Sequence, residues 1–357
     1  MLIKPVLKTD PFGKAPNGEE ITLYTLEIPD VIRASVMNFG ATLTHLFVPD
    51  RNGKMEDVVL GFDDFEGYQN KQYLEKYCYI GSTVGRIGGR IRGNEFELDG
   101  VKYKLEPNNG STHLHGGKEG WDRKIWNAEP FEAEDGVGVV FSLMSPDGEG
   151  NYPGSIDFQV TYKVNLQSEL SIEYRGTTDK ATILNPTNHS YFNLSGDFSK
   201  KISDHKLQLT ASHFLPIDEK SLPTGELRDV KDSPFDFLEP KEIGKSLAKE
   251  DDQIKLGNGI DHSFAFDSQV DCARLFEPIS GRLLVLSTTE PGVQVYTSNY
   301  LDGSIPGKGG GTYGQHSAIC LETQHFPDSI NQKHFPSVVL RPGEVFHSIS
   351  TFKFSAL

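Results

Sequence analysis

Glu95-Phe-Glu-Leu-Asp-Gly-Val-Lys-Tyr-Lys-Leu105 alternates apolar and charged side chains on both sides of Asp99-Gly100. An Asp-Gly pair between two alternating runs is a strong signal for a two-residue hairpin turn. Such a turn fixes the facing pairs as Leu98 with Val101, Glu97 with Lys102, Phe96 with Tyr103, and Glu95 with Lys104. Apolar pairs share one face and opposite charges share the other, so the turn and the pairing agree. The sequence therefore predicts an antiparallel β-hairpin.

The same alternation continues along most of the chain, in short β-branched and aromatic runs separated by Gly, Pro, Asn and Asp. These runs predict strands. The expected strands are residues 21–28, 41–48, 137–143, 156–164, 169–174, 283–287, 293–297 and 345–354. Helix signals are scarce, and only residues 239–249 are expected to form a short helix. Without repeats or a break in composition, residues 1–357 are expected to form one domain, a single large antiparallel β-sandwich.

The charge balance restricts the partners. The 35 Lys and Arg residues against 50 Asp and Glu residues give a formal net charge of -15. This charge repels nucleic acid and acidic membranes, and it disfavours phosphorylated ligands. A neutral small-molecule substrate fits best.

The three cysteines, Cys78, Cys272 and Cys320, are widely spaced and form no CxxC motif. Neither a disulfide framework nor a cysteine zinc site is expected, which indicates a reducing compartment. The N-terminus lacks the apolar core of a signal peptide, and no apolar run approaches membrane-spanning length. The sequence predicts a cytoplasmic protein. It does not report the oligomeric state, and a monomer is favoured.

Asn185-Pro-Thr-Asn-His-Ser-Tyr-Phe-Asn-Leu-Ser-Gly196 places polar groups in a segment that otherwise has the character of a buried strand. Alternate residues of an extended chain share a face, so His189, Tyr191 and Asn193 are expected to point together into a pocket. His189 is the residue of this segment whose charge changes near neutral pH, which makes it a natural proton donor or acceptor. A hydrogen-bonded core histidine is the alternative.

Gly85-Arg-Ile-Gly-Gly-Arg-Ile-Arg92 contains glycines that allow the backbone to approach a ligand closely. No helix pattern follows, so this segment is not a dinucleotide-binding fingerprint. Taken alone, it is better interpreted as a glycine-rich bend with solvated arginines.

His113-Leu-His-Gly-Gly-Lys-Glu119 superficially resembles the HxHxxxE metal motif of cupins. The cupin glycine positions are absent and no second motif supplies a further histidine, so a metal site is the weaker interpretation. His115 is instead expected to make a polar contact beside an aromatic wall formed by Trp121 and Trp126.

Three further polar residues lie in apolar strand-like surroundings. Asp261 is flanked by apolar residues and is either an ordered pocket carboxylate or a turn cap. Gln294 shares a strand face with Tyr296 and is either a pocket residue or part of a solvated face. Glu322 follows three apolar residues, which should desolvate it and raise its basicity. Its alternative role is a strand-end glutamate paired with an arginine.

Taken together, these motifs resemble the galactose mutarotase (aldose 1-epimerase) family over nearly the whole chain. The segments that carry the resemblance are residues 108–126, 185–196, 222–226, 261–262, 291–301, 321–331, 340–344 and 352–355. The resemblance implies a β-sandwich enzyme, an isomerase that interconverts the α and β anomers of free aldohexoses such as D-galactose and D-glucose.

The resemblance also implies roles for individual residues. His189 would be the general acid and Glu322 the general base. Sugar contacts would come from Arg90, His115, Tyr191, Asp261 and Gln294. One departure is visible, because the family motif GRxxNRI has Asn where this chain has Gly89. The contact made at that position is therefore in doubt, although the acid and base are unaffected.

The chemistry needs no cofactor, metal or nucleotide. One base deprotonates the C1 hydroxyl and one acid protonates the ring oxygen, and the two exchange roles when the ring recloses. A histidine with a pKa of ~6.5 is protonated about a quarter of the time at pH 7, and the neighbouring carboxylates are expected to raise that share. The alternatives are a glycosidase, a hexose-6-phosphate 1-epimerase and a non-catalytic sugar-binding protein.

Overall fold

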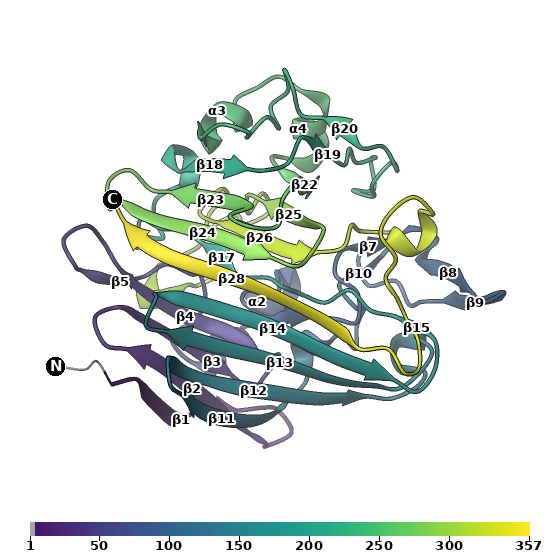
Figure 1. The fold of residues 1–357 in the computed structure, drawn as a ribbon, viewed down its shortest axis with the longest axis horizontal. Coiled ribbons are helices and arrows are strands. Elements are labelled where there is room, and N and C mark those ends of the chain that lie inside the picture. The colour runs from purple at the N-terminus through teal and green to yellow at the C-terminus, as the bar shows by residue number, and fades with distance from the viewer. Residues whose placement is uncertain (1–3) are drawn as a thin grey trace.

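The computed structural model describes residues 4–357, and antiparallel β-strands make up most of its regular structure (Figure 1). The strands form sheets of nine, six and five strands together with several two-stranded pairs. The prediction of an all-β sandwich is confirmed. Among the described residues, no helix has the length and apolar character needed to cross a membrane.

The nine-stranded sheet runs through the centre of the molecule. In spatial order it contains β11 (Asn127–Ala133), β12 (Gly136–Ser145), β13 (Ile156–Asn165), β14 (Glu169–Thr178), β28 (Phe346–Ala356), β24 (Arg282–Thr288), β23 (Ala273–Phe276), β18 (Lys206–Leu209) and β21 (Lys241–Glu242). Along β13, buried residues alternate with more exposed ones, as expected for a strand with one face on the core.

The five-stranded sheet covers one half of that core face. It contains β1 (Val6–Lys14), β2 (Glu20–Ile28), β3 (Ile32–Met37), β4 (Thr42–Pro49) and β5 (Met55–Asp57). Strands β2 and β3 contact β12 and β13. Side chains such as Leu26 and Val36 join Phe141 and Val160 in one buried cluster, which holds the two sheets together.

The six-stranded sheet provides one wall of the candidate site. In spatial order it contains β17 (Tyr191–Phe192), β26 (Ile319–Gln324), β25 (Gly292–Tyr296), β22 (Asp261–Ala265), β19 (His213–Phe214) and β20 (Arg228–Asp229). The register places Ser263 beside Gln294, and Gln294 beside Glu322. Three polar residues distant in sequence therefore form a row across one sheet.

The remaining elements are short. The strand pairs are β6 (Thr83–Val84) with β16 (Thr187–Asn188), β7 (Arg90–Ile91) with β10 (His113–Leu114), β8 (Glu95–Leu98) with β9 (Val101–Lys104), and β15 (Thr182–Ile183) with β27 (Val339–Leu340). The α-helices are α1 (Phe65–Tyr68), α2 (Lys71–Lys76), α3 (Ile243–Leu247) and α4 (Asp252–Gly257). The 3-10 turns are η1 (Arg92–Asn94), η2 (Trp121–Arg123), η3 (Glu149–Asn151), η4 (Ile202–Asp204), η5 (Lys308–Gly310) and η6 (Ser329–Asn331).

The predicted strands are all present, and the β8–β9 hairpin has the predicted register. Asp99 and Gly100 both have positive φ, as its two-residue turn requires. The helix expected at 239–249 is wrong in extent, because Lys241–Glu242 pair with β18 and the helix occupies only Ile243–Leu247.

Residues 185–194 are buried, and the segment 185–196 does not form one continuous strand. The chain pairs first with β6 through β16 and then with β26 through β17, and His189 lies at the junction between the two. His189 and Tyr191 line the main cavity, but Asn193 is wrongly predicted to do so. Its amide donates to the carbonyls of Lys200 and Ser317, which hold it in the core.

Candidate active site

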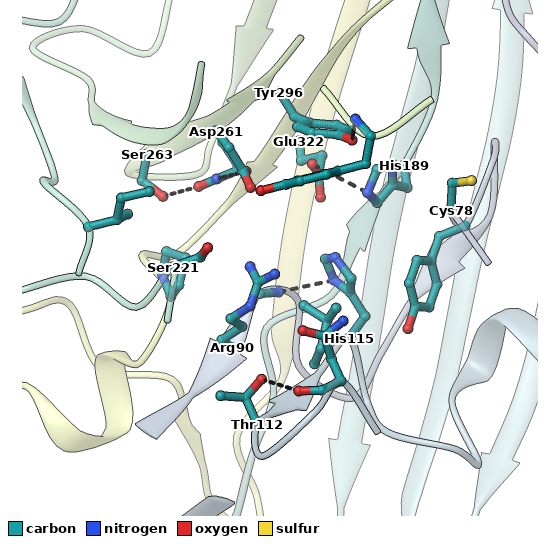
Figure 2. A pocket seen from close by; sticks show the side chains of 18 of the residues that line it. Cys78, Arg90, Thr112, His115, His189, Ser221, Asp261, Ser263, Tyr296 and Glu322 are labelled. Atoms are coloured by element: carbon teal, nitrogen blue, oxygen red, sulfur yellow. Dashed lines mark hydrogen bonds and ion pairs between the residues drawn. The ribbon is translucent and has the colours of Figure 1, made fainter. Parts of the chain in front are cut away.

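A cavity of about 500 Å³ lies against the six-stranded sheet. It is bounded on one side by Asp261, Gln294 and Glu322, and Figure 2 shows Arg90 and His115 across from them. The residues predicted for the site all line this cavity: Gly89, Arg90, His115, His189, Tyr191, Asp261, Gln294 and Glu322. The fold therefore brings together side chains from β7, β17, β22, β25, β26 and the connecting loops.

The imidazole of His189 is held by its backbone and by stacking. The backbone N–H of His189 donates to the carbonyl of Ser82, and the backbone carbonyl of His189 accepts from the N–H of Gly81. The rings of Tyr191 and Tyr79 lie nearly parallel to it, at centroid distances of 5.0 and 6.0 Å. Nδ1 is 3.5 Å from the Sγ of Cys320, so Nε2 is the nitrogen directed at Glu322.

The expectation that neighbouring carboxylates favour the charged form of His189 is wrong. Burial lowers the pKa of His189 to about 4, because the imidazolium loses its hydration in the closed cavity. At neutral pH the free imidazole is therefore uncharged. A hydrogen bond to the backbone opposes this effect, but desolvation is the larger of the two.

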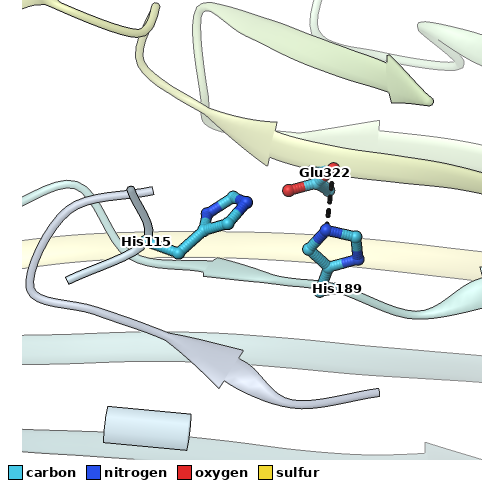
Figure 3. A group of neighbouring side chains, drawn as sticks. All are labelled: His115, His189 and Glu322. Carbon is cyan, nitrogen blue, oxygen red and sulfur yellow. Dashed lines mark ion pairs between the residues drawn. The ribbon is translucent and has the colours of Figure 1, made fainter. Parts of the chain in front are cut away.

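Glu322 lies near the middle of β26, with Oε1 3.6 Å from Nε2 of His189 (Figure 3). Within residues 4–357, His189 is its one ion-pair partner and Oε2 has no hydrogen-bond partner. Burial raises the pKa of Glu322 well above its usual value, the charge of Asp261 raises it further, and Arg90 opposes both effects. The predicted increase in basicity is confirmed, and an arginine-paired strand end is not what the structure contains.

Asp261 and Gln294 form a hydrogen-bonded row beside Glu322. Nε2 of Gln294 donates to Oδ1 of Asp261 at 2.7 Å, and its Oε1 accepts from Ser263. Enclosure raises the pKa of Asp261, whereas Arg90 and the amide of Gln294 lower it. Gln294 orients the Asp261 carboxylate, so the alternative of a solvent-facing strand is wrong.

His115 has a defined tautomer. The backbone N–H of Gly89 can only donate, and it lies 3.1 Å from Nδ1 of His115. Burial lowers the pKa of this imidazole well below its usual value, so the ring is neutral and carries its proton on Nε2. His115 therefore presents a hydrogen-bond donor to the pocket.

Gly89 is required by its backbone. Its φ is +75°, and a Cβ there would lie 2.9 Å from Cβ and Cγ of Pro327. Glycine adopts this conformation without strain and leaves the space beside Pro327 open. The departure from the family motif thus coincides with a tight contact in this chain.

His115, His189 and Glu322 have potential metal-ligand atoms within 4.8 Å of one another (Figure 3). The residues fit a metal ion poorly, because ligation by Nε2 of His115 requires a proton on Nδ1, where Gly89 already donates. In the cupin-like motif, His113 bonds instead to Tyr152 and the carbonyl of Glu106, away from His115. Its histidines do not converge.

The prediction that Trp121 and Trp126 form an aromatic wall beside His115 is wrong. Trp121 and Trp126 belong to the main hydrophobic core, where large apolar rings bury the most surface. The cavity is lined by tyrosines instead: Tyr77, Tyr79, Tyr191, Tyr296 and Tyr300. The sequence signal for Tyr77 and Tyr79 is weak, since both lie in a loop with positive φ rather than in a periodic strand.

The glycine-rich segment is not a solvated bend either. Arg86 is buried and donates to the carbonyls of Ser145, Pro146, Pro153 and Gly154, whereas Arg90 faces the cavity. Sequence reasoning also overlooked Gln324. The alternation that placed Glu322 on the pocket face of β26 could have identified it, because Gln324 is two residues farther along.

Comparisons with known proteins identify the family of the chain. A model of the aldose 1-epimerase family matches residues 22–353. The galactose mutarotase of Bos taurus is 44% identical over 348 residues, covering 96% of this chain and 97% of the relative. The aldose 1-epimerase of Escherichia coli K12 is 34% identical with the same coverage.

The fold is shared as well. The crystal structure of galactose 1-epimerase from Lactobacillus acidophilus NCFM superimposes with a TM-score of 0.85 at 30% sequence identity. The match covers 98% of this chain and 99% of that chain.

Proposed function

The chain belongs to the aldose 1-epimerase family, and we propose that the cavity between His189 and Glu322 is where it opens and recloses the ring of a free aldohexose. The protein is an isomerase that interconverts α and β anomers. The observation that carries the assignment is the 3.6 Å separation of Nε2 and Oε1, with the two pKa values shifted in opposite directions.

The distance suits the reacting group. The C1 hydroxyl and the ring oxygen are bonded to the same carbon, so the acid and the base must act on two oxygens separated by one carbon atom. Nε2 and Oε1 are close enough for each to reach one of these oxygens at hydrogen-bond distance. The cavity volume of about 500 Å³ is in the range of small-molecule sites.

Ring opening and ring closure each transfer one proton at the C1 oxygen and one proton at O5. Glu322 takes the proton of the C1 hydroxyl while His189 gives a proton to the ring oxygen, and the C1–O5 bond breaks to leave the aldehyde. After rotation about C1–C2, His189 recovers the proton from the O5 hydroxyl. Glu322 protonates the aldehyde oxygen as O5 attacks the other face. No atom is gained or lost.

The pair holds one proton in its working state. In the empty pocket burial places that proton on Glu322, since its pKa is raised and that of His189 is lowered. Proton transfer across 3.6 Å produces the carboxylate and imidazolium, and each charge then stabilises the other. Nδ1 faces Cys320, whose sulfur can accept a hydrogen bond from the Nδ1 proton, so Nε2 of the neutral ring keeps a free lone pair to receive the proton of Glu322.

The remaining residues of the cavity bind and orient the sugar. Arg90 supplies donors, His115 donates from Nε2, and Asp261 accepts from sugar hydroxyls. Gly89 leaves space beside Pro327, and Tyr191 offers its ring face. D-galactose is the substrate we propose first, because the mammalian relatives are named galactose mutarotases.

We also propose that residues 1–357 act as one domain in a cytoplasmic monomer. Cys78, Cys272 and Cys320 are all free thiols, as a reducing compartment favours. His189, Glu322 and the proposed sugar-contacting residues all come from this chain.

Polarimetry of freshly dissolved α-D-galactose, with a chelator present, tests the function. The protein should bring the rotation to equilibrium faster than buffer alone, and should do the same with α-D-glucose. Glucose 6-phosphate should be a poorer substrate, because the total charge and the two pocket carboxyl groups oppose a phosphate. The proposal would be contradicted if the free sugars mutarotated no faster with the protein than in buffer alone. Release of reducing sugar from methyl α-galactoside would contradict it as well.

A further inference from the structure

Gln324 is a buried amide without a partner. Its side chain is 1% exposed and lines the main cavity, yet within residues 4–357 neither Oε1 nor Nε2 has a hydrogen-bond partner. Buried polar groups are normally paired, and an unpaired one beside a cavity indicates that the partner comes from the cavity.

Gln294 provides an internal comparison on the adjacent strand. Its Oε1 accepts from Ser263 and its Nε2 donates to Asp261, so both ends of the amide are occupied by the protein. The residue paired with Gln324 across the same two strands is Gly292, which has no side chain to offer. Of these two glutamines, Gln324 is the one with free hydrogen-bonding capacity.

The neighbouring backbone holds the Gln324 amide in place. A Cβ at Gly88 would lie 2.2 Å from Oε1 of Gln324, so the amide packs directly against that glycine. The Gly88 N–H donates to the carbonyl of Asn185 and is not available to Gln324. The amide is therefore fixed but unsatisfied.

The position along β26 defines which part of the sugar Gln324 can reach. Gln324 follows Glu322 by two residues on the same strand face, a step of roughly 6.6 Å. This step is comparable with the separation of the O1 and O4 oxygens across a pyranose, if Glu322 contacts the C1 hydroxyl. Gln324 then meets the ring edge remote from C1.

We propose that Gln324 hydrogen-bonds a hydroxyl at C3 or C4 of the aldose and discriminates between sugars at that position. The inference rests on the proposed function of the same cavity. An amide offers one acceptor and one donor group, and a hydroxyl can satisfy either. A site built to pair a hydroxyl rejects the analogue that lacks it, because the protein group is then left unpaired.

The test compares Gln324→Met with the parent on D-galactose and its 2-, 3- and 4-deoxy analogues. The variant should lose about 10- to 100-fold in kcat/KM on galactose. On the 3-deoxy or the 4-deoxy sugar the two proteins should differ by less than about threefold, because the contact is already missing. On the 2-deoxy sugar the full loss should remain.

Gln294→Met serves as the matched control, since it removes an amide that orients Asp261. The fall in kcat/KM caused by Gln294→Met should persist on the deoxy sugar for which Gln324→Met and the parent become similar. Should Gln324→Met fail to fold, Gln324→Glu retains the shape and the acceptor but removes the donor, and the same analogue series applies.

Equal losses of Gln324→Met on all four sugars, relief by the 2-deoxy sugar, or no loss at all would overturn the inference. Failure of the proposed function would be seen in the parent protein alone, as absence of faster mutarotation. In that event, calorimetry measures the dissociation constants of the parent and of Gln324→Met for the same four sugars. A difference between the two proteins that disappears only for the 3-deoxy or the 4-deoxy sugar still supports the contact.

Discussion

Two largely buried carboxyl groups, those of Asp57 and Glu322, have opposite surroundings. Asp57 accepts from the backbone of Leu46 and Val59 and from Lys308, which also donates to the carbonyls of Thr44 and Val59. Glu322 has a neutral imidazole at 3.6 Å and one oxygen without a partner in the described chain. A fully paired carboxylate contributes to structure, whereas the incompletely paired one retains capacity for a substrate.

Burial raises the pKa of both carboxyl groups, but the neighbouring charges that oppose this increase differ between the two sites. For Asp57 the charge of Lys308 opposes the effect of burial. For Glu322 the second carboxyl, Asp261, adds to it, and Arg90 is the opposing charge. The comparison therefore predicts that changes at the first site affect mainly stability and changes at the second mainly turnover.

The largest effect is expected for His189→Asn. Removing one proton-transfer partner should lower kcat by ~10²- to 10⁴-fold, while the thermal midpoint changes little. Polarimetry with α-D-galactose measures the rate, and calorimetry measures the midpoint. If the variant retains more than a tenth of the parent kcat, the prediction that changes at the Glu322 site act mainly on turnover is wrong.

Lys308→Met should act mainly on folding. It leaves the Asp57 carboxylate buried without its cation, and breaking a buried pair in this way costs about 3–5 kcal/mol of stability. Urea unfolding measures the loss. Lys71→Met, at an exposed pair with Glu75, is the matched control and should change stability by less than about 1 kcal/mol. Equal effects of the two substitutions would refute this prediction, as would a kcat for folded Lys308→Met far below that of the parent.

Glu322→Gln should raise the thermal midpoint by a few degrees, increasingly so at higher pH. The folded-state pKa of Glu322 lies above the unfolded value, so the folded protein binds the proton more tightly. The parent is thus favoured at low pH and loses stability as the pH rises towards the folded-state pKa. The amide has no such dependence. Midpoints measured from pH 5 to pH 9 should diverge; parallel curves for the two proteins would contradict this.

The pH profile of kcat/KM should show a smaller effect. Turnover needs one proton on the pair, so the acidic limb appears where His189 also becomes protonated and Glu322 can no longer accept. Because the pKa of His189 is lowered to about 4, that limb should lie near pH 4. A limb near pH 6.5 would show that the imidazole retains its ordinary basicity in the free enzyme.

Much of the fold could be predicted, because alternation is a local property. The β8–β9 register followed from Asp99-Gly100 and its flanking pairs. Residues His189 and Glu322 were identifiable as titratable groups in apolar strands, and their joint placement in one cavity supports the roles that the resemblance implied. The sequence could not show that His189 lies at a break between two strand pairings, since that depends on which distant strands each half meets.

Other features depend on partners that leave no local pattern. Arg86 is buried because distant backbone carbonyls accept its hydrogen bonds, and any sequence supplies carbonyls. Trp121 and Trp126 were expected in the pocket wall for their proximity to His115, but large apolar rings are more stable in the core. The pKa of His189 likewise depends on how completely the tertiary fold excludes water.

The most direct measurement of the central claim is the rate at which Glu322→Gln equilibrates freshly dissolved α-D-galactose in a polarimeter. The substitution keeps the shape of the side chain and removes the base. We predict a kcat at least ~10²-fold below that of the parent, with the sugar still bound. A variant that equilibrates the anomers as fast as the parent would contradict the assignment of Glu322 as the group that takes the C1 hydroxyl proton.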